Sequence, residues 1–172
     1  MSAVPMNDDD TLRAEGLRVV LDVDGDGDGD GDAGRDGRSA SGAITLRPVD
    51  GLSLTLRRGQ TLALVGESGC GKSLTALALM RLLPEGGAVE AGSIRLGADA
   101  AAAPGSATEL LDLSEAQMRR LRGARIGMVF QDPGSSLNPV LTLGAQLREV
   151  IEAHTPLRGA AARARAQAWL AR

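Results

Sequence analysis

The sequence predicts an α/β domain in which a buried strand leads through a glycine-rich loop into a helix. The apolar run TLALV, Thr61–Val65, directly precedes GESGCGKS, and the helix-forming stretch LTALALMRLL follows this loop. A second apolar run, ARIGMVF at Ala124–Phe130, has the length and composition of another buried strand. From Thr142 onward, apolar residues recur at helical spacing. Strands that alternate with helices in this way are typical of α/β proteins.

Before the loop, the sequence predicts two strands separated by a low-complexity tract. We expect the first strand at Leu17–Val23 and the second at Leu52–Leu56, where leucines alternate with polar residues; Gly59 supplies a turn after it. The tract Asp24–Gly42, rich in Asp and Gly, has little to bury and is predicted to be a disordered insertion. It begins like a calcium loop, but Ala33 stands where such a loop needs its bidentate glutamate.

After the loop, the sequence predicts a helix, a strand and a surface loop in that order. The helix starts near Lys72 and is predicted to end at Pro84, because proline cannot continue a helix. The run SIRL, Ser93–Leu96, predicts an edge strand, and the small residues of Ala98–Thr108 predict a surface loop.

The last part of the chain is predicted to be mainly helical. Ser114 and Gln117 form the pattern of a capping box, and Gly123 predicts the end of that helix. QDPGSSLNP predicts a polar loop, and AAARARAQAWLAR predicts a final helix by propensity. Between them, an amphipathic helix from Thr142 is expected to bury one stripe, made of Leu143, Leu147, Val150 and Ile151.

Composition and charge exclude several classes of protein. Only 1% of the residues are aromatic, so the core must be aliphatic. The net charge is -3, its acidic excess lies in the N-terminal part, and no stripe of arginines interleaved with aromatic residues indicates nucleic-acid binding. The single cysteine excludes an internal disulfide and a cysteine-based zinc site. The sequence has no signal-peptide pattern and no apolar run long enough to span a bilayer.

The segment GESGCGKS matches the phosphate-loop pattern G-x-x-x-x-G-K-[ST]. Glycines let such a loop turn its backbone N–H groups toward a pyrophosphate, and the following helix directs its N-terminal dipole at the same phosphates. Lys72, the only lysine in the chain, supplies a compact, mobile charge for the outer phosphates, and Ser73 supplies a hydroxyl for Mg²⁺. The predicted nucleotide-binding residues of this loop are Gly66, Glu67, Ser68, Gly69, Cys70, Gly71, Lys72, Ser73 and Leu74.

Cys70 lies inside the predicted loop. The sequence places no histidine beside it, so we interpret it as a small side chain that a tight loop tolerates rather than as a catalytic thiol. Its alkylation should block nucleotide binding, and bound MgATP should protect it. Equal alkylation rates with and without saturating MgATP would contradict this placement.

The loop alone leaves kinases, GTPases and transporter ATPases open. A GTPase needs an N-K-x-D loop to bind the base, which is impossible when Lys72 is the only lysine. A kinase would need a second acidic site or an arginine-rich lid, for which the sequence gives no positive support. A non-functional remnant that folds poorly is a further alternative.

The stretch RIGMVFQDPGSSLNPVLTLGAQLREVI, Arg125–Ile151, separates these classes. A buried strand that ends at Phe130 and is followed by Gln131 resembles the Q-loop of ATP-binding cassette (ABC) proteins. The continuation QDPGSSLNP and the leading segment VDGLSLTLRRGQTLALVGESGCGKS resemble the ATP-binding subunits of oligopeptide, dipeptide and nickel importers. The resemblance covers residues 12–23 and 47–172.

The resemblance implies an ABC-type P-loop NTPase fold with an N-terminal antiparallel β part, the start of a parallel core sheet and a helical region. It implies ATP and Mg²⁺ as ligands, with Ser73 and Gln131 near the metal and Gln131 sensing the γ-phosphate. It implies that Asp132–Leu147 faces integral membrane permease subunits, that a second ATP-binding subunit pairs with this one, and that a solute-binding protein acts indirectly. The implied function is to energise import of peptides or related small solutes from the cytoplasmic face of the cell membrane.

The sequence departs from the pattern of this family in three places, the first being the tract described above. Leu21 occupies the position where the family usually has an aromatic residue that stacks on adenine, which predicts weak or unselective base binding. The 172 residues contain no LSGGQ signature, no Walker B strand with its catalytic glutamate and no switch histidine; His154 lies too early and is expected to be an exposed helix residue. We therefore expect a partial domain at residues 12–172, after a disordered N-terminus at residues 1–11, that binds nucleotide at most.

Overall fold

The computed structural model describes residues 6–7, 9–23, 44–98, 106–131 and 133–171. These residues belong to two compact units, Met1–Leu113 and Ser114–Arg172, where the sequence predicts one domain. The predicted insertion Asp24–Gly42 lies outside the described residues. In the described ranges, no helix is both long and apolar enough to cross a bilayer.

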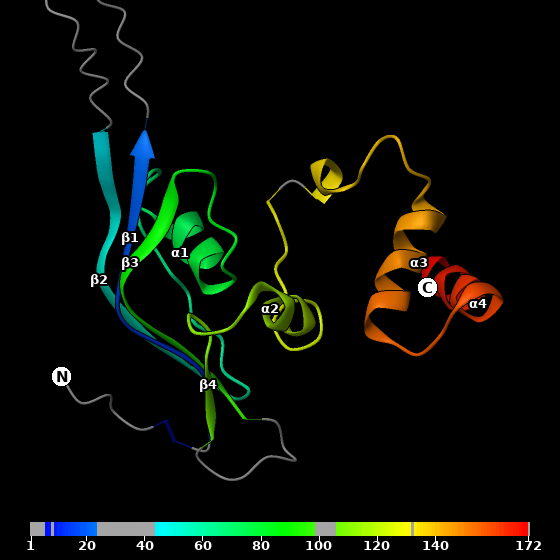
Figure 1. Ribbon diagram of the computed structural model, residues 1–172, viewed down its shortest axis with the longest axis horizontal. Helices are drawn as coiled ribbons and strands as arrows, with labels where there is room; N and C mark the ends of the chain where they lie inside the picture. The colour runs from blue at the N-terminus through cyan, green and yellow to red at the C-terminus, as the bar shows by residue number, and fades with distance from the viewer. Residues whose placement is uncertain (1–5, 8, 24–43, 99–105, 132, 172) are drawn as a thin grey trace, which may run out of the picture. The chain divides into compact units, whose positions relative to one another are not determined.

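The first unit is built on a four-stranded antiparallel sheet with the strand order β2-β1-β3-β4 (Figure 1). The predicted strands Leu17–Val23 and Leu52–Leu56 are confirmed as parts of the longer strands β1 and β2, and β1 begins at Asp10, ahead of the predicted domain start. The strands are β1 Asp10–Val23, β2 Ile44–Arg57, β3 Gly87–Gly97 and β4 Ala107–Glu109.

A bulge at Gly16 keeps the apolar side chains of β1 on one face of the sheet. The buried positions are Leu12 and Ala14 before the bulge and Leu17 and Val19 after it, so the inward-facing positions shift by one residue. Gly16 has a φ of 58°, which glycine adopts without strain. The core of this unit is aliphatic, as the composition predicts, and includes Leu12, Ala14, Leu17, Val19, Val49, Ala78, Ile94 and Leu96.

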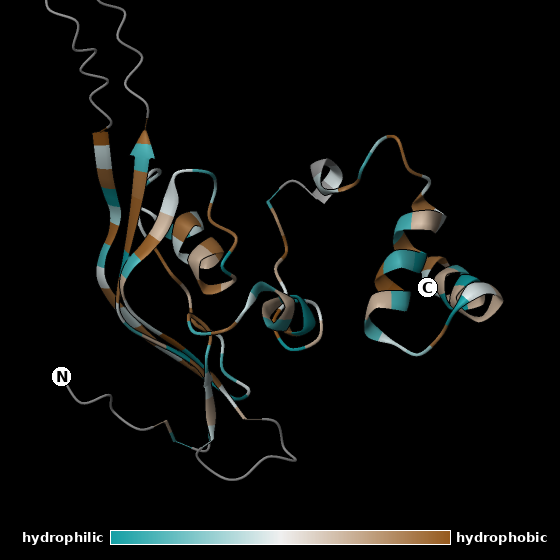
Figure 2. Ribbon diagram, viewed as in Figure 1, coloured by the Kyte–Doolittle hydropathy of each residue, from teal (hydrophilic) through white to brown (hydrophobic). Residues whose placement is uncertain are grey.

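Helix α1, Lys72–Leu79, lies against one face of this sheet and is largely apolar (Figures 1 and 2). It ends before the predicted stop at Pro84. Arg81 adopts a left-handed φ of 52°, and its N–H donates to the carbonyl of Ala78 at 2.9 Å, which closes the last turn. The Arg81 guanidinium also donates to the carbonyl of Leu110 at 3.0 Å, so a tertiary contact supports this helix end.

Strand β3 differs from its prediction. The sequence predicts an edge strand at Ser93–Leu96, but β3 pairs with β1 on one side and with β4 on the other. Strand β4 includes Thr108, the end of the predicted surface loop, whereas residues 99–105 of that loop lie outside the described part. The reason for the error is that β4 is too short to show an alternating pattern, so the sequence does not reveal the neighbour of β3.

Two segments that the sequence predicts to be buried strands are not strands. Thr61–Val65 pairs with no strand among the described residues, and Ala124–Phe130 takes part only in a single bridge between Arg122 and Ile126. Val65 and Val129 are each 90% exposed. A central strand requires hydrogen-bonded neighbours and covered faces, and neither segment has a neighbouring strand in the part of the chain that the structure describes. Both predictions are therefore wrong.

The second unit begins with helix α2, Glu115–Leu121, whose capping box is confirmed. The N–H of Ser114 donates to the Gln117 side-chain oxygen at 2.8 Å, and the N–H of Gln117 donates to Ser114 Oγ at 3.4 Å. Gly123, with a φ of 81°, follows the helix as predicted. The predicted polar loop contains a short 3-10 helix, η1 Pro133–Ser136.

Helices α3, Leu143–His154, and α4, Gly159–Leu170, pack against each other and confirm the predicted helical end of the chain. Thr142 caps α3, because its Oγ1 accepts a hydrogen bond from the N–H of Ala145 at 3.2 Å. Only part of the predicted stripe is covered, since Leu143 and Val150 are exposed. A small core cluster of α3 and α4 consists of Ile151, Ala162 and Ala166, with Leu147 and Leu157 packed against it.

Candidate functional site

The glycine-rich loop links the segment Thr61–Val65 to helix α1. Gly69 and Gly71 both adopt left-handed conformations, with φ values of 82° and 87°. L-amino acids with a side chain rarely adopt this conformation, so the backbone requires glycine at these positions. At Gly66, a Cβ atom would lie 2.5 Å from Cys70 Sγ, which shows how tightly the loop folds on itself.

Gly71 fixes the end of the loop against strand β2. A Cβ atom at this position would lie 2.2 Å from the carbonyl oxygen of Pro48 and 3.2 Å from Val49 Cγ2. Gly71 is also the N-cap of α1 and has no side chain to cap the helix, while its carbonyl accepts hydrogen bonds from the N–H and Oγ1 of Thr75 at 2.8 and 2.9 Å. The N–H groups of the first helical turn are thus left for another acceptor, an arrangement that suits an anion.

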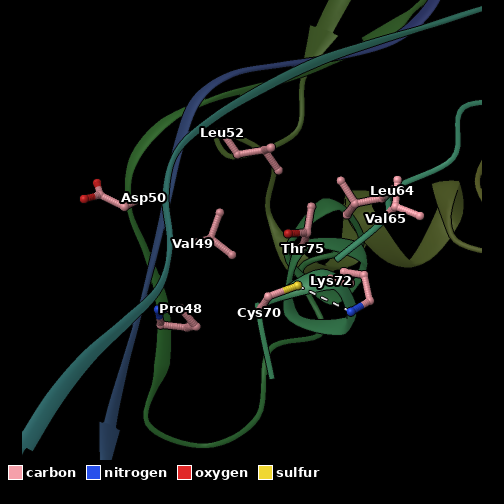
Figure 3. A pocket seen from close by; sticks show the side chains of 9 residues that line it. All are labelled: Pro48, Val49, Asp50, Leu52, Leu64, Val65, Cys70, Lys72 and Thr75. Atoms are coloured by element: carbon pink, nitrogen blue, oxygen red, sulfur yellow. Dashed lines mark hydrogen bonds between the residues drawn. The ribbon is translucent and has the colours of Figure 1, made fainter. Parts of the chain in front are cut away.

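The Lys72 side chain lies across the loop. Its Nζ donates to the carbonyl oxygens of Gly66 and Glu67, at 2.8 and 2.6 Å, and contacts Cys70 Sγ at 3.4 Å (Figure 3). The loop carbonyls thereby hold a positive charge next to the N-terminus of α1. A phosphate oxygen that binds here would meet both the ammonium group and the positive end of the helix dipole.

A cavity of about 210 Å³ lies beside the loop, smaller than the roughly 300–1,000 Å³ typical of pockets for whole ligands. Asp50, at its edge, projects to the opposite side of β2 from Val49 and Leu52 (Figure 3). Its carboxylate accepts a hydrogen bond from Arg18 Nε at 2.6 Å and raises the pKa of that guanidinium. The cavity is lined by Pro48, Val49, Asp50, Leu52, Leu64, Val65, Cys70, Lys72 and Thr75.

The structure brings part of the predicted site together. The predicted residues Gly66–Leu74 form one continuous loop and helix start within the first unit, and the Ser73 side chain is exposed. Gln131 belongs to the second unit, where it is exposed, so its place in the same site stays a prediction. His154 is the exposed last residue of α3, as expected.

The donor set suits Mg²⁺ only as the companion of a phosphate ligand. The described residues contain no group of three His, Cys, Asp or Glu side chains that could hold a metal ion by themselves. Mg²⁺ commonly binds through one or two protein oxygens, substrate phosphates and water, and the exposed Ser73 hydroxyl can supply such an oxygen.

Sequence reasoning missed the contribution of β2 to this site. Pro48 and Val49 contact Gly71 through the packing of the β-sheet against the start of α1. No local motif marks them, because the contact depends on the tertiary position of β2. Thr75 was also missed, although a hydroxyl that bonds back to the helix is a recurrent feature of threonine in helices.

A lysine and a hydroxyl at the start of a helix, after a loop with two left-handed glycines, define a phosphate-loop domain. The family model described as ABC transporter matches residues 49–172. The chain belongs to the ABC transporter family, which confirms the resemblance found in the sequence and decides against the kinase alternative.

Several curated proteins are similar to part of this chain. The glutathione import ATP-binding proteins GsiA of Salmonella choleraesuis (strain SC-B67) and Salmonella typhi are 53% and 52% identical to it over 107 residues. GsiA of Escherichia coli (strain K12) is 51% identical over 110 residues. Each alignment covers 62% of this chain and 16% of the relative, so the chain spans only a small part of the length of these relatives.

Proposed function

We propose that this chain is the nucleotide-binding part of an ABC importer ATPase. It binds ATP together with Mg²⁺ through Gly66–Leu74, with Ser73 supplying a hydroxyl to the metal. The relatives that match it are named as ATP-binding proteins of glutathione import, which supports a role in importing peptides or related small solutes. The transported substrate itself is left open, because the ATP-binding subunit does not contact it in this family.

The position of Lys72 carries this proposal. Its ammonium group is held by two loop carbonyls at 2.8 and 2.6 Å, next to a helix start that no side chain caps. An anion at this place can accept hydrogen bonds from the backbone N–H groups of the loop, pair with the Lys72 ammonium group and interact with the positive end of the α1 dipole. The same ammonium can exchange a carbonyl partner for a phosphate oxygen without leaving the loop.

Nucleotide titration of the 172-residue chain tests this role. We expect Lys72→Ala to weaken MgATP binding by roughly tenfold or more, because a hydrogen bond to a charged group is lost. Arg119→Ala, which removes the same charge from an exposed position on α2, is the matched control and should leave the affinity unchanged. Isothermal titration calorimetry measures both. Equal affinities of Lys72→Ala and the unaltered chain would refute the proposal.

We propose that Gln131 joins this site when nucleotide is bound and senses the γ-phosphate. Its exposed amide at the beginning of the polar loop is available for such a contact. Gln131→Ala should then reduce the affinity for MgATP while leaving the affinity for ADP unchanged. Gln60→Ala, at an exposed turn of the first unit, serves as the control. An unchanged ratio of ATP to ADP affinity in Gln131→Ala would argue against this role.

The second unit is proposed to contact integral membrane permease subunits through the segment 132–147. The exposed apolar side chains of Leu137, Val140, Leu141 and Leu143 support this, because such side chains are unfavourable in water and typical of contact surfaces. The chain would then work at the cytoplasmic face of the membrane, paired with a second ATP-binding subunit and indirectly with a solute-binding protein.

Cysteine crosslinking tests this assignment. Val140→Cys in a Cys70→Ser background should form crosslinks to membrane subunits, and Arg119→Cys, on α2 in the same background, is the control. Equal crosslinking of the two variants would contradict the assignment.

We expect nucleotide binding without turnover from these 172 residues. The sequence contains no Walker B carboxylates and no LSGGQ signature, so it offers no general base for the attacking water. A coupled assay of phosphate release should show no ATP hydrolysis above background. ATP hydrolysis by the unaltered chain that is lost in Lys72→Ala would contradict this expectation. It would not contradict the proposal that the chain binds nucleotide.

A further inference from the structure

We propose that Arg81 is a positioning residue that links the start of helix α2 to the phosphate-binding helix α1. The link runs through the peptide group that joins Leu113 to Ser114, because Arg81 binds the carbonyl of this group and α2 binds its N–H. The response of the link to a ligand rests on the proposed nucleotide binding, whereas the link itself does not.

Arg81 follows α1 at a backbone position that usually requires glycine. The N–H of Arg81 donates to the carbonyl of Ala78 at 2.9 Å. The N–H of Leu82 donates to the carbonyl of Leu77 at 2.8 Å, which completes the Schellman arrangement of a helix C-terminus. With a φ of 52°, Arg81 is the only non-glycine residue of positive φ in the described part of the chain. This conformation costs an arginine free energy that glycine would avoid, so the interactions of its side chain must offset that cost.

The Arg81 side chain binds two carbonyl groups of the segment between β4 and α2. Its Nη1 donates to the carbonyl of Leu110 at 3.0 Å and to the carbonyl of Leu113 at 2.5 Å. Leu110 is fully buried, and its N–H donates to the carbonyl of Ile94 in β3 at 2.7 Å. Arg81 therefore joins Leu113 to a carbonyl that is fixed on the sheet against which α1 packs.

The peptide group between Leu113 and Ser114 is held at both of its polar atoms. Its carbonyl accepts the bond from Arg81, and its N–H, which belongs to Ser114, donates to the Gln117 side-chain oxygen at 2.8 Å. A peptide group is planar, so a fixed carbonyl also fixes the direction of the N–H. Ser114 is the N-cap of α2, and its carbonyl accepts hydrogen bonds from the N–H groups of Gln117 and Met118, both at 3.0 Å. The first turn of α2 therefore depends on Arg81.

Helix α1 connects this link to the phosphate loop. It starts at Lys72 and has eight residues, which corresponds to a length of about 12 Å. A hydrogen-bonded helix of two turns moves as one body, so a ligand that orders the Lys72 end also restricts the Arg81 end. Binding at the loop should therefore slow local opening at the start of α2, and loss of the Arg81 side chain should remove this effect.

Hydrogen exchange at the amides of Gln117 and Met118, followed by NMR on the 172-residue chain, tests the link without a ligand. Arg81→Met removes the donors and keeps the positive φ, and should speed exchange at these amides by roughly tenfold. Arg81→Gly also removes the donors but relieves the backbone, so faster exchange in this variant cannot come from backbone strain. Arg58→Met, at an exposed turn after β2, is the control and should leave exchange unchanged.

The amide of Val19 in the middle of β1 separates a local effect from general destabilisation. Its exchange should be unchanged in Arg81→Gly, because this fully buried residue reports the opening of the sheet rather than of α2. Exchange at Gln117 and Met118 that is unchanged in both Arg81 variants would overturn the proposal. An equal increase at Val19 and Met118 in Arg81→Gly would overturn it as well.

A second measurement adds MgATP at concentrations that saturate each variant. In the unaltered chain, exchange at Gln117 and Met118 should slow by about threefold or more, and in Arg81→Gly it should not slow. Equal slowing in both proteins, or none in a chain that binds MgATP, would show that the link does not respond to the ligand. If MgATP does not bind the unaltered chain, the proposed nucleotide binding fails, while the exchange measured without ligand still decides the link.

Discussion

Strand β1 and the segment Thr61–Val65 both contain runs of apolar residues, but these residues have opposite environments. In β1, Leu17 and Val19 are each 0% exposed, and β2 and β3 pair with the strand on both sides. In the second segment, Val65 is 90% exposed, and no strand pairs with it in the described residues. The difference shows that an apolar run becomes a buried strand only when neighbouring strands satisfy its backbone hydrogen bonds.

The phosphate loop keeps its geometry even though the segment before it forms no strand. Its end is fixed by the close approach of Gly71 to Pro48 of β2, and its interior by the bonds of Lys72 to two loop carbonyls. The loop is therefore anchored by β2 and α1 rather than by Thr61–Val65. Substitutions in β1 and substitutions in the loop should therefore have separately measurable effects on stability and on nucleotide binding.

The largest effect is expected in β1. Leu17→Ala should lower the free energy of unfolding by about 2–5 kcal/mol, because it leaves a cavity at a fully buried position. Urea denaturation of the 172-residue chain, followed by circular dichroism, measures the change. A loss below about 1 kcal/mol would mean that the core around β1 does not control stability.

The second effect tests the anchor of the loop. Gly71→Ala should destabilise the chain by about 2–4 kcal/mol and abolish MgATP binding, because its Cβ would collide with a backbone oxygen in a left-handed conformation. Gly69→Ala has a similar φ but open space around its Cβ, and should cost only about 1–2 kcal/mol. Equal losses for the two variants, measured by thermal unfolding and nucleotide titration, would show that β2 does not anchor the loop.

The smallest effect is expected in the exposed apolar segments. Val65→Thr and Val129→Thr should each change the free energy of unfolding by less than about 0.5 kcal/mol, since both side chains are already in water. They should also delay aggregation on heating, because exposed apolar runs are prone to pair between chains and threonine replaces an apolar methyl group with a hydroxyl. Light scattering during a temperature ramp checks the second point. A loss of stability as large as that of Leu17→Ala would place these segments in a packed core after all.

Local chemistry explains which predictions succeeded. Ser114 with Gln117 and Gly123 after α2 act through hydrogen bonds or dihedral angles that involve only nearby residues, and both are as expected. The edge position of β3 and the buried strands at Thr61–Val65 and Ala124–Phe130 were wrong, because each depends on a neighbour distant in the sequence.

The sequence by itself determined the phosphate loop, the membership in the ABC transporter family and the aliphatic character of the core. These properties follow from residue types at fixed spacing, and glycine, lysine and serine have the same local chemistry wherever the loop is placed. Only the tertiary structure decided that β1 lies inside the sheet, that Pro48 of β2 holds Gly71, and that the cavity beside the loop is aliphatic. Those properties depend on contacts between distant segments, which are set by strand register and packing rather than by local pattern.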